Sequence, residues 1–144
     1  MSEAAKSEPV AALIRRYYDA FGAKDHEGML ACLAEGVEHR VNQGEVRLGK
    51  GAFGEFLDRM RRSYDERLED LVILTEPTGR RAAAEFTVQG VYRVRAEGAP
   101  PARGQRYTLP AGAFFEVRDG SIARVSTYYN LAEWLRQVES GNVS

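Results

Sequence analysis

The sequence predicts an α+β domain with helices concentrated in the first half and strands in most of the second. Two observations lead to this prediction. Apolar residues recur at helical spacing in three segments before residue 61, and after residue 67 the pattern changes to β-branched runs separated by turn signals such as Asp119-Gly120. The chain has 144 residues, 44% of them hydrophobic, which is enough for a single core.

Three helices are predicted before the main group of strands. Residues 1–8 are expected to be a disordered tail, and Pro9 then begins a helix that Gly22 ends. Asp25 has the side chain of an N-cap for a short second helix, and a third follows the glycines at 49 and 51. The apolar positions of these helices are Val10, Leu13, Ile14, Tyr17, Tyr18, Phe21, Met29, Leu30, Leu33, Phe53, Phe56, Leu57 and Met60.

The remaining segments are predicted to form strands and a final helix. A first strand alternates over 37–42, and four more are expected at 68–75, 82–94, 106–117 and 122–129. Asn130 has the side chain of an N-cap for a terminal helix that carries Trp134. We therefore expect one domain over residues 9–139, followed by a C-terminal tail at 140–144.

Composition excludes several classes of protein. The formal net charge is -1, so the chain lacks the basic excess typical of nucleic-acid binders. No apolar run has membrane-spanning length and the first residues lack a signal-peptide core, so we expect no membrane partner and a cytoplasmic location. The single cysteine, Cys32, lies in an apolar segment and is interpreted as a buried residue rather than a nucleophile. No His/Cys cluster has ligand spacing, so no metal or cofactor is expected.

Four segments, in this order, resemble a known superfamily. They are residues 12–21 followed by Asp25, residues 37–39, residues 47–56 and residues 115–122. Their order is similar to that of the NTF2-like superfamily, and within it to the ketosteroid isomerase-related and SnoaL-like polyketide cyclase group. The resemblance spans about Pro9 to Val138. It implies a conical barrel in which a curved antiparallel sheet wraps around the N-terminal helices and encloses a pocket.

The resemblance also implies two catalytic residues. Ketosteroid isomerases use a first-helix tyrosine as donor to the enolate oxygen, and that position falls on Tyr17. They use a first-strand carboxylate as base, and that position falls on His39. Their second donor, a protonated aspartate on a later strand, is replaced here at Ala113. The resemblance therefore keeps the tyrosine, changes the base and loses one donor.

The residues themselves leave alternatives open. A neutral imidazole at His39 can accept a proton near neutral pH, but it can equally be a core histidine. Tyr17 can donate to an oxyanion or serve as an amphipathic core residue. Glu85 can face the pocket or the solvent, and we favour the solvent. Further residues are predicted to bind the ligand, with a turn as the alternative for Asn42, a cross-strand contact as the alternative for Tyr128, and core packing as the alternative for most others. They are Asn42, Phe53, Phe56, Met60, Phe86, Val88, Ala113, Phe115, Tyr128 and Trp134.

Three functions remain in competition. The first is an isomerase- or cyclase-type enzyme that moves protons on a small apolar carbonyl compound. The second is a carrier or sensor that binds an apolar molecule without turnover. The third is an assembly module, because apolar residues on both faces of the long strands favour a homodimer through the outer face of the sheet.

Overall fold

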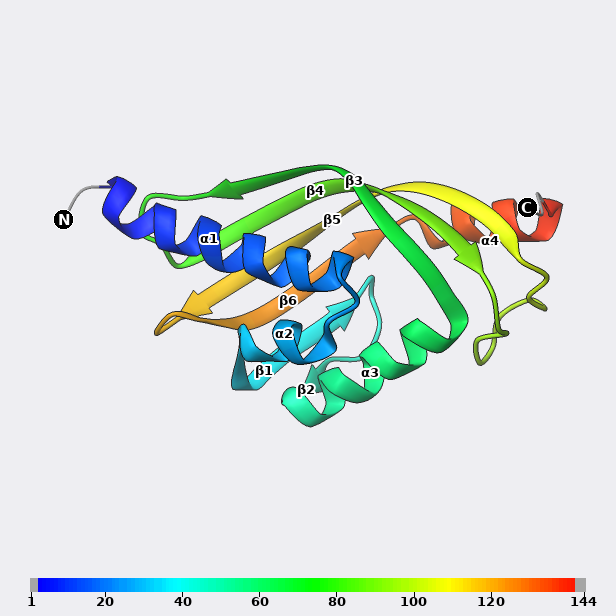
Figure 1. Cartoon of the computed structure of the whole chain (residues 1–144), viewed down its shortest axis with the longest axis horizontal. Coiled ribbons are helices and arrows are strands. Elements are labelled where there is room, and N and C mark those ends of the chain that lie inside the picture. The colour runs from blue at the N-terminus through cyan, green and yellow to red at the C-terminus, as the bar shows by residue number, and fades with distance from the viewer. Residues whose placement is uncertain (1–2, 142–144) are drawn as a thin grey trace.

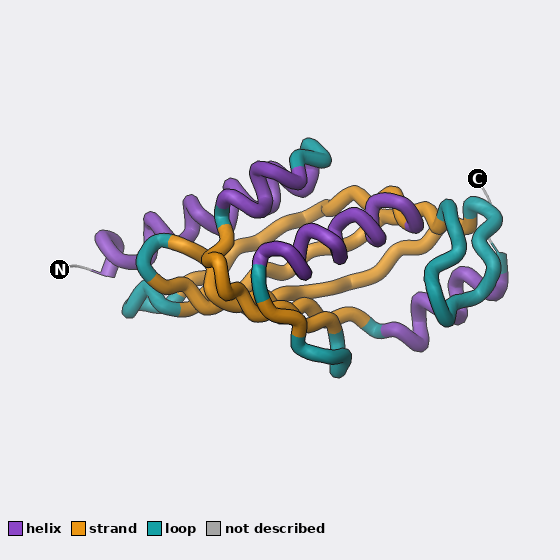
Figure 2. Tube along the Cα trace, turned by 90° about the horizontal axis from the view of Figure 1, so that it is seen from below, coloured by secondary structure: helices purple, strands orange, loops and turns teal. Residues whose placement is uncertain are grey.

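A curved sheet of six strands, in the order β2-β1-β6-β5-β4-β3, forms the frame of the protein. The computed structural model describes residues 3–141. Helices α1, α2 and α3 cover one face of this sheet, and α4 lies at one end (Figures 1 and 2). The helices are α1 (Glu3–Gly22), α2 (His26–Ala31), α3 (Lys50–Ser63) and α4 (Leu131–Ser140). The strands are β1 (Leu33–Val41), β2 (Arg47–Leu48), β3 (Tyr64–Thr75), β4 (Arg81–Tyr92), β5 (Gln105–Arg118) and β6 (Ser121–Tyr129).

The first helix is longer than the sequence predicts. It begins at Glu3 and contains Pro9 in its interior, so the expected disordered tail is wrong for residues 3–8. Alanine, lysine and glutamate dominate this segment and are strong helix formers, which offsets the hydrogen bond that a proline removes. The first two residues of that predicted tail lie outside the described residues. At the other end α4 closes on Gly141, whose φ of 80° favours glycine. Residues 142–144 of the predicted C-terminal tail also lie outside the described part.

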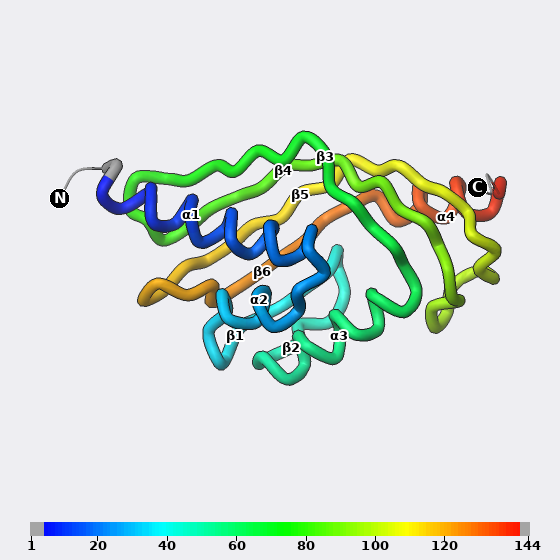
Figure 3. Tube along the Cα trace, in the orientation of Figure 1, coloured from blue at the N-terminus to red at the C-terminus, as the bar shows by residue number. Residues whose placement is uncertain are grey.

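The sheet is mixed rather than wholly antiparallel. Strands β3 to β6 form an antiparallel meander, but β1 pairs with β6 in parallel, with Val41 opposite Thr127. The expected antiparallel sheet is corrected at this one ladder. The geometric reason is that the chain leaves β1, passes through α3 and three long strands, and returns beside β1 in the same direction, as the tube in Figure 3 shows.

Strand β3 begins four residues earlier than predicted. Its first part, Tyr64-Asp65-Glu66-Arg67, is too charged to be recognised as a strand, yet it pairs fully with β4, with Tyr64 opposite Tyr92 and Glu66 opposite Gly90. The pairing satisfies the backbone of this segment, whereas half of its side chains face the interior of the fold. This correction matters because it brings a carboxyl group into the pocket described below.

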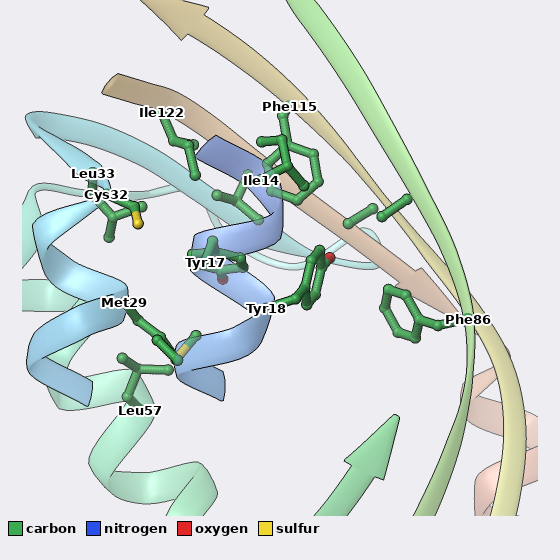
Figure 4. Close-up of a cluster of buried hydrophobic side chains, with 14 of the residues drawn as sticks. Ile14, Tyr17, Tyr18, Met29, Cys32, Leu33, Leu57, Phe86, Phe115 and Ile122 are labelled. Atoms are coloured by element: carbon green, nitrogen blue, oxygen red, sulfur yellow. The ribbon is translucent and has the colours of Figure 1, made fainter. Parts of the chain in front are cut away.

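The core lies between α1 and the concave face of the sheet. Ile14, Phe115 and Ile122 are fully buried there. Figure 4 shows Tyr17 turned toward α2 and Tyr18 turned toward the sheet, where Phe86 and Phe115 lie. Each side chain of this size contributes about 1.5–3 kcal/mol when buried.

No described helix within residues 3–141 is long and apolar enough to cross a membrane.

Candidate functional site

A cavity of about 570 Å³ lies between the three N-terminal helices and the concave face of the sheet. Its volume falls in the range of small-molecule sites. Apolar side chains such as Leu57, Leu68 and Leu109 form much of the wall. Five basic side chains also line it, namely Lys24, Arg47, Arg61, Arg62 and Arg93. The site is therefore a mostly apolar cavity whose wall also carries several positively charged side chains.

His39 lies on β1 and lines this cavity. Its ring packs against Phe53 and Phe56 of α3, with centroid distances of 4.4 and 4.5 Å. The pKa of His39 is lowered to about 4, first because burial disfavours the charged imidazole and second because the Arg47 guanidinium is near. His39 is consequently neutral at pH 7.

The two ring nitrogens of His39 have different surroundings. Nδ1 is enclosed and has no hydrogen-bond partner among the described residues. A buried polar atom without a partner costs about 1–3 kcal/mol, so such an atom calls for a functional explanation. Nε2 is the nitrogen left for a ligand. The strand register explains the placement of the ring, because Val37 and His39 both turn inward.

Tyr17 also lines the cavity, from α1. Its ring contacts Phe53 at 6.4 Å between centroids, so Phe53 lies beside both Tyr17 and His39. No hydrogen bond engages the Tyr17 hydroxyl within residues 3–141, which leaves the group available to a ligand. Burial raises the pKa of Tyr17 well above its ordinary value, with a smaller contribution from Cys32. Tyr17 therefore stays protonated and can donate.

Five of the other predicted ligand residues line the cavity. They are Phe56, Met60, Phe86, Val88 and Trp134. Three more are buried beside it in the core, namely Phe53, Ala113 and Phe115. On β5 the cavity is reached by Ala111 rather than by Ala113, so the position of the lost second donor is occupied by packed core.

Two predicted ligand residues lie elsewhere. Tyr128 takes the cross-strand alternative and does not line the cavity: its ring lies on the outer face of the sheet, 38% exposed, against Phe114 at 5.9 Å. Asn42 takes the turn alternative: its φ is 52° and its Oδ1 accepts a hydrogen bond from the Tyr129 backbone N–H at 2.9 Å. Glu85 is exposed, as favoured.

The structure adds polar residues that the sequence did not single out. Tyr64 and Glu66 of β3 and Tyr129 of β6 line the cavity, and the Tyr107 hydroxyl donates a hydrogen bond of 2.5 Å to Glu66 Oε2. Burial raises the pKa of Glu66 above its ordinary value. Strand alternation through 64–68 is the one signal that could have found this group.

Metal ligation has no candidate among residues 3–141, where no three His, Cys, Asp or Glu side chains come together. His26 lies near Asp58 instead, with 3.6 Å between Nδ1 and Oδ1. Cys32 is buried, its thiol contacts the Gly28 carbonyl oxygen at 3.5 Å, and burial raises its pKa. This environment suits a packed residue better than a nucleophile.

Comparison with known proteins places this fold and cavity in a defined class. An NTF2-like protein of Burkholderia pseudomallei superposes with a TM-score of 0.77 at 19% identity, covering 90% of this chain and 97% of that one. The fold is therefore NTF2-like. The SnoaL-like domain matches residues 14–125, and the chain belongs to this family.

Two solved structures are much more similar in sequence. A protein of Xanthomonas campestris pv. campestris, provisionally named a polyketide cyclase, is 50% identical with a TM-score of 0.89, covering 92% of this chain and 98% of that one. A protein of Silicibacter sp., provisionally named in the same way, is 52% identical with a TM-score of 0.89, covering 92% and 96%. No functionally curated protein matches the sequence. These likenesses support a cyclase- or isomerase-type function in general terms.

Proposed function

We propose that this protein is an isomerase- or cyclase-type enzyme that moves protons on a small apolar carbonyl compound with its own side chains. The observation that carries the proposal is the placement of His39. A neutral imidazole lines an apolar cavity, and Phe53 lies beside both this ring and that of Tyr17. The family and its provisionally named cyclases support the same class of chemistry.

The mechanism assigns one role to each residue. His39 Nε2 takes a proton from the carbon next to the carbonyl group, while the Tyr17 hydroxyl donates a hydrogen bond to the carbonyl oxygen as negative charge develops there. The proton then returns to a carbon of the same molecule, or the enolate attacks a second carbonyl carbon, whose oxygen is protonated as the imidazolium gives up its proton. Because Tyr17 stays protonated, it stabilises the oxyanion without ionising.

One observation favours a second function, binding without turnover. A pKa of about 4 makes His39 a weaker base than a histidine near 6.5. A carrier of an apolar molecule would use the same cavity and would not need the imidazole. It predicts saturable binding that survives the loss of His39, together with no chemical change in the ligand.

We also propose that two copies pair through the outer face of the sheet. An outer apolar patch, formed by Val72, Leu74, Ala83, Phe114 and Tyr128, is exposed or half-buried there. Cross-strand register places Leu74, Ala83 and Phe114 in one row, and the Phe114 ring contacts that of Tyr128 at 5.9 Å between centroids. The exposed Glu85 lies opposite Val72 on the same face. Exposed apolar patches of this kind commonly mark contacts between proteins. A second copy presents the same patch, which satisfies the requirement for a self-complementary interface.

Hydrogen exchange in D₂O tests the catalytic proposal. The probe is 1,5-diphenylpentan-1-one, whose protons next to the carbonyl are followed by NMR. We expect the wild-type protein to accelerate exchange, His39→Gln to lose about 10²–10⁴-fold and Tyr17→Phe about 10²–10³-fold. Glu97→Gln, in the exposed loop between β4 and β5 and outside both the cavity lining and the outer apolar patch, is the matched control and should match the wild type. Exchange that is unchanged in His39→Gln would contradict the proposal and favour the carrier.

A further inference from the structure

A row of three residues crosses the sheet at the cavity. Glu66 on β3 is opposite Gly90 on β4, and Gly90 is opposite Tyr107 on β5. All three turn to the concave side, because side chains in register on neighbouring strands share a face. The Tyr107 hydroxyl nevertheless reaches past the middle strand and donates its hydrogen bond to Glu66 Oε2.

Gly90 makes this reach possible. A Cβ atom at position 90 would lie 2.1 Å from Cζ of Tyr107 and 2.4 Å from its hydroxyl oxygen. The phenol ring therefore lies directly over the glycine. Glycine weakens a strand interior, and it is typical of places where another group approaches the backbone closely. Here the approaching group is the ring that holds Glu66.

Glu66 lies across the cavity from His39. Strand β1 lies next to one edge of the sheet and β3 at the other edge, and the sheet between them is curved. Both residues line that cavity. The site thus has a neutral imidazole on one wall and a carboxyl group on another.

The surroundings of Glu66 shift the pKa of its carboxyl group in both directions. The titratable groups that act on it are Tyr107 on β5, Asp65 on β3 and Lys24 after α1, and Glu66 in turn raises the pKa of Tyr64 and of Tyr129. Burial, the largest effect, raises the pKa of Glu66 and the neighbouring Asp65 adds to it, whereas the Tyr107 hydrogen bond and the Lys24 ammonium group lower it. Oε2 is engaged by Tyr107, whereas Oε1 has no hydrogen bond within the described residues. Oε1 is therefore the oxygen free to meet a ligand, and it can carry the proton when the carboxyl group is neutral.

We propose that Glu66, positioned by Tyr107 across Gly90, is a second acid that binds and protonates an oxygen of the ligand distinct from the one that Tyr17 meets. This inference rests on the proposed function. In the cyclising reaction His39 takes the proton from carbon, a carbon–carbon bond forms to a second carbonyl carbon, and the oxygen of that carbonyl takes the proton of Glu66. His39 then gives its proton to solvent and Glu66 takes a proton from solvent. Both residues thereby return to their starting protonation states. The ligand accordingly carries two carbonyl groups.

The test measures how much a second carbonyl oxygen in the ligand adds to the binding affinity. The probes are diphenyl diketones with two to five methylene groups between the carbonyls, each compared with the monoketone of the same length. Binding is followed by quenching of Trp134, the single tryptophan, which lines the cavity. For at least one spacing we expect the wild type to prefer the diketone by 10-fold or more. Glu66→Leu should reduce that preference below 2-fold, and its affinity for the monoketone should stay within 2-fold of the wild-type value.

Matched variants separate positioning from packing. Glu69→Leu alters a carboxylate on the same strand that bonds Arg67 and Gln89, and it should leave the preference unchanged. In wild type the preference should fall as rising pH removes the proton from Glu66. Tyr107→Phe removes a hydrogen bond that lowers the pKa of Glu66, so this fall should move to higher pH. Gly90→Ala keeps the Tyr107 phenol but places a Cβ atom where its ring lies. The fall in preference should therefore move to higher pH in this variant as well.

Three results would overturn the inference: no diketone preferred over its monoketone in wild type, a Glu66→Leu variant that weakens both probes equally, or an unshifted pH profile in both Tyr107→Phe and Gly90→Ala. Failure of the proposed function gives a different result, namely no hydrogen exchange of the monoketone by the wild-type protein. If hydrogen exchange depends on His39 but the diketone preference is unchanged in Glu66→Leu, this inference is overturned and the proposed function stands.

Discussion

His39 and Arg47 lie directly opposite each other in the ladder between β1 and β2, so a guanidinium group stands beside a buried imidazole. The Arg47 side chain also lies over the Phe56 ring, with Cζ 5.2 Å from the centroid. Both burial and this positive charge disfavour the imidazolium. Burial, with the smaller effect of this charge, therefore sets the protonation state on which the catalytic proposal depends.

The first prediction concerns the pKa of His39 itself. NMR of the imidazole resonances should show His39 titrating near pH 4. Arg47→Gln should raise this pKa toward 6.5 without reaching it, because burial is the larger cause and remains in the variant. A wild-type His39 that titrates at 6.5, or a pKa that Arg47→Gln leaves unchanged, would show that the site is wetter than described.

The second prediction concerns stability. Between pH 6.5 and about 4 the unfolded chain binds a proton at His39 that the folded protein does not, so the free energy of unfolding falls as the pH falls through this window. The loss due to this residue is about 3 kcal/mol. Urea unfolding at pH 7 and pH 4 should therefore show a smaller loss in His39→Gln than in wild type. The difference between the two losses of unfolding free energy removes the contribution of the carboxyl groups, because these titrate in the same pH range in both proteins. An equal loss in both proteins would refute the assignment.

A third prediction contrasts two buried tyrosines. Tyr17→Phe should leave the free energy of unfolding nearly unchanged, because no described residue bonds its hydroxyl. Tyr92→Phe should lower it by about 1–3 kcal/mol, because its hydroxyl bonds the Pro100 carbonyl oxygen and the Ala96 N–H, and these would lose their partner. Denaturant unfolding measures both. A marked loss in Tyr17→Phe would indicate that the hydroxyl serves the fold rather than a ligand.

The fourth prediction tests the outer apolar patch. Phe114 is 52% exposed, so Phe114→Arg should fold normally but convert a dimer into a monomer in light scattering. Leu48→Arg is the matched control: Leu48 is 66% exposed but lies on β2, outside the patch. A wild-type monomer, or a dimer that survives Phe114→Arg, would exclude this interface.

Much of the fold follows from sequence periodicity, and its failures are local. The apolar spacing of residues 10–21 predicts the face of α1 that packs on the sheet, and the alternation around His39 predicts that this ring turns inward. Periodicity could not predict that β1 pairs in parallel with β6, because that ladder depends on how the chain returns after three other strands. It also left the face of Tyr128 open, because the outer face carries aromatic rings too, with Phe114 beside Tyr128.

The candidate site was accessible to sequence reasoning only in part. Tyr17 and His39 occupy apolar faces, so their inward placement could be expected. Glu66 lies in a run of charged residues that resembles a solvated surface, and its role depends on a tyrosine 41 positions away that reaches it across a glycine. No local pattern encodes that contact.

The most direct test is the crystal structure of the protein with bound 1,5-diphenylpentan-1-one. The account predicts the carbonyl oxygen within about 2.6–3.2 Å of the Tyr17 hydroxyl, with the adjacent carbon facing His39 Nε2. A ketone that binds with its carbonyl remote from both residues, or a His39 Nε2 occupied by a protein partner, would contradict it.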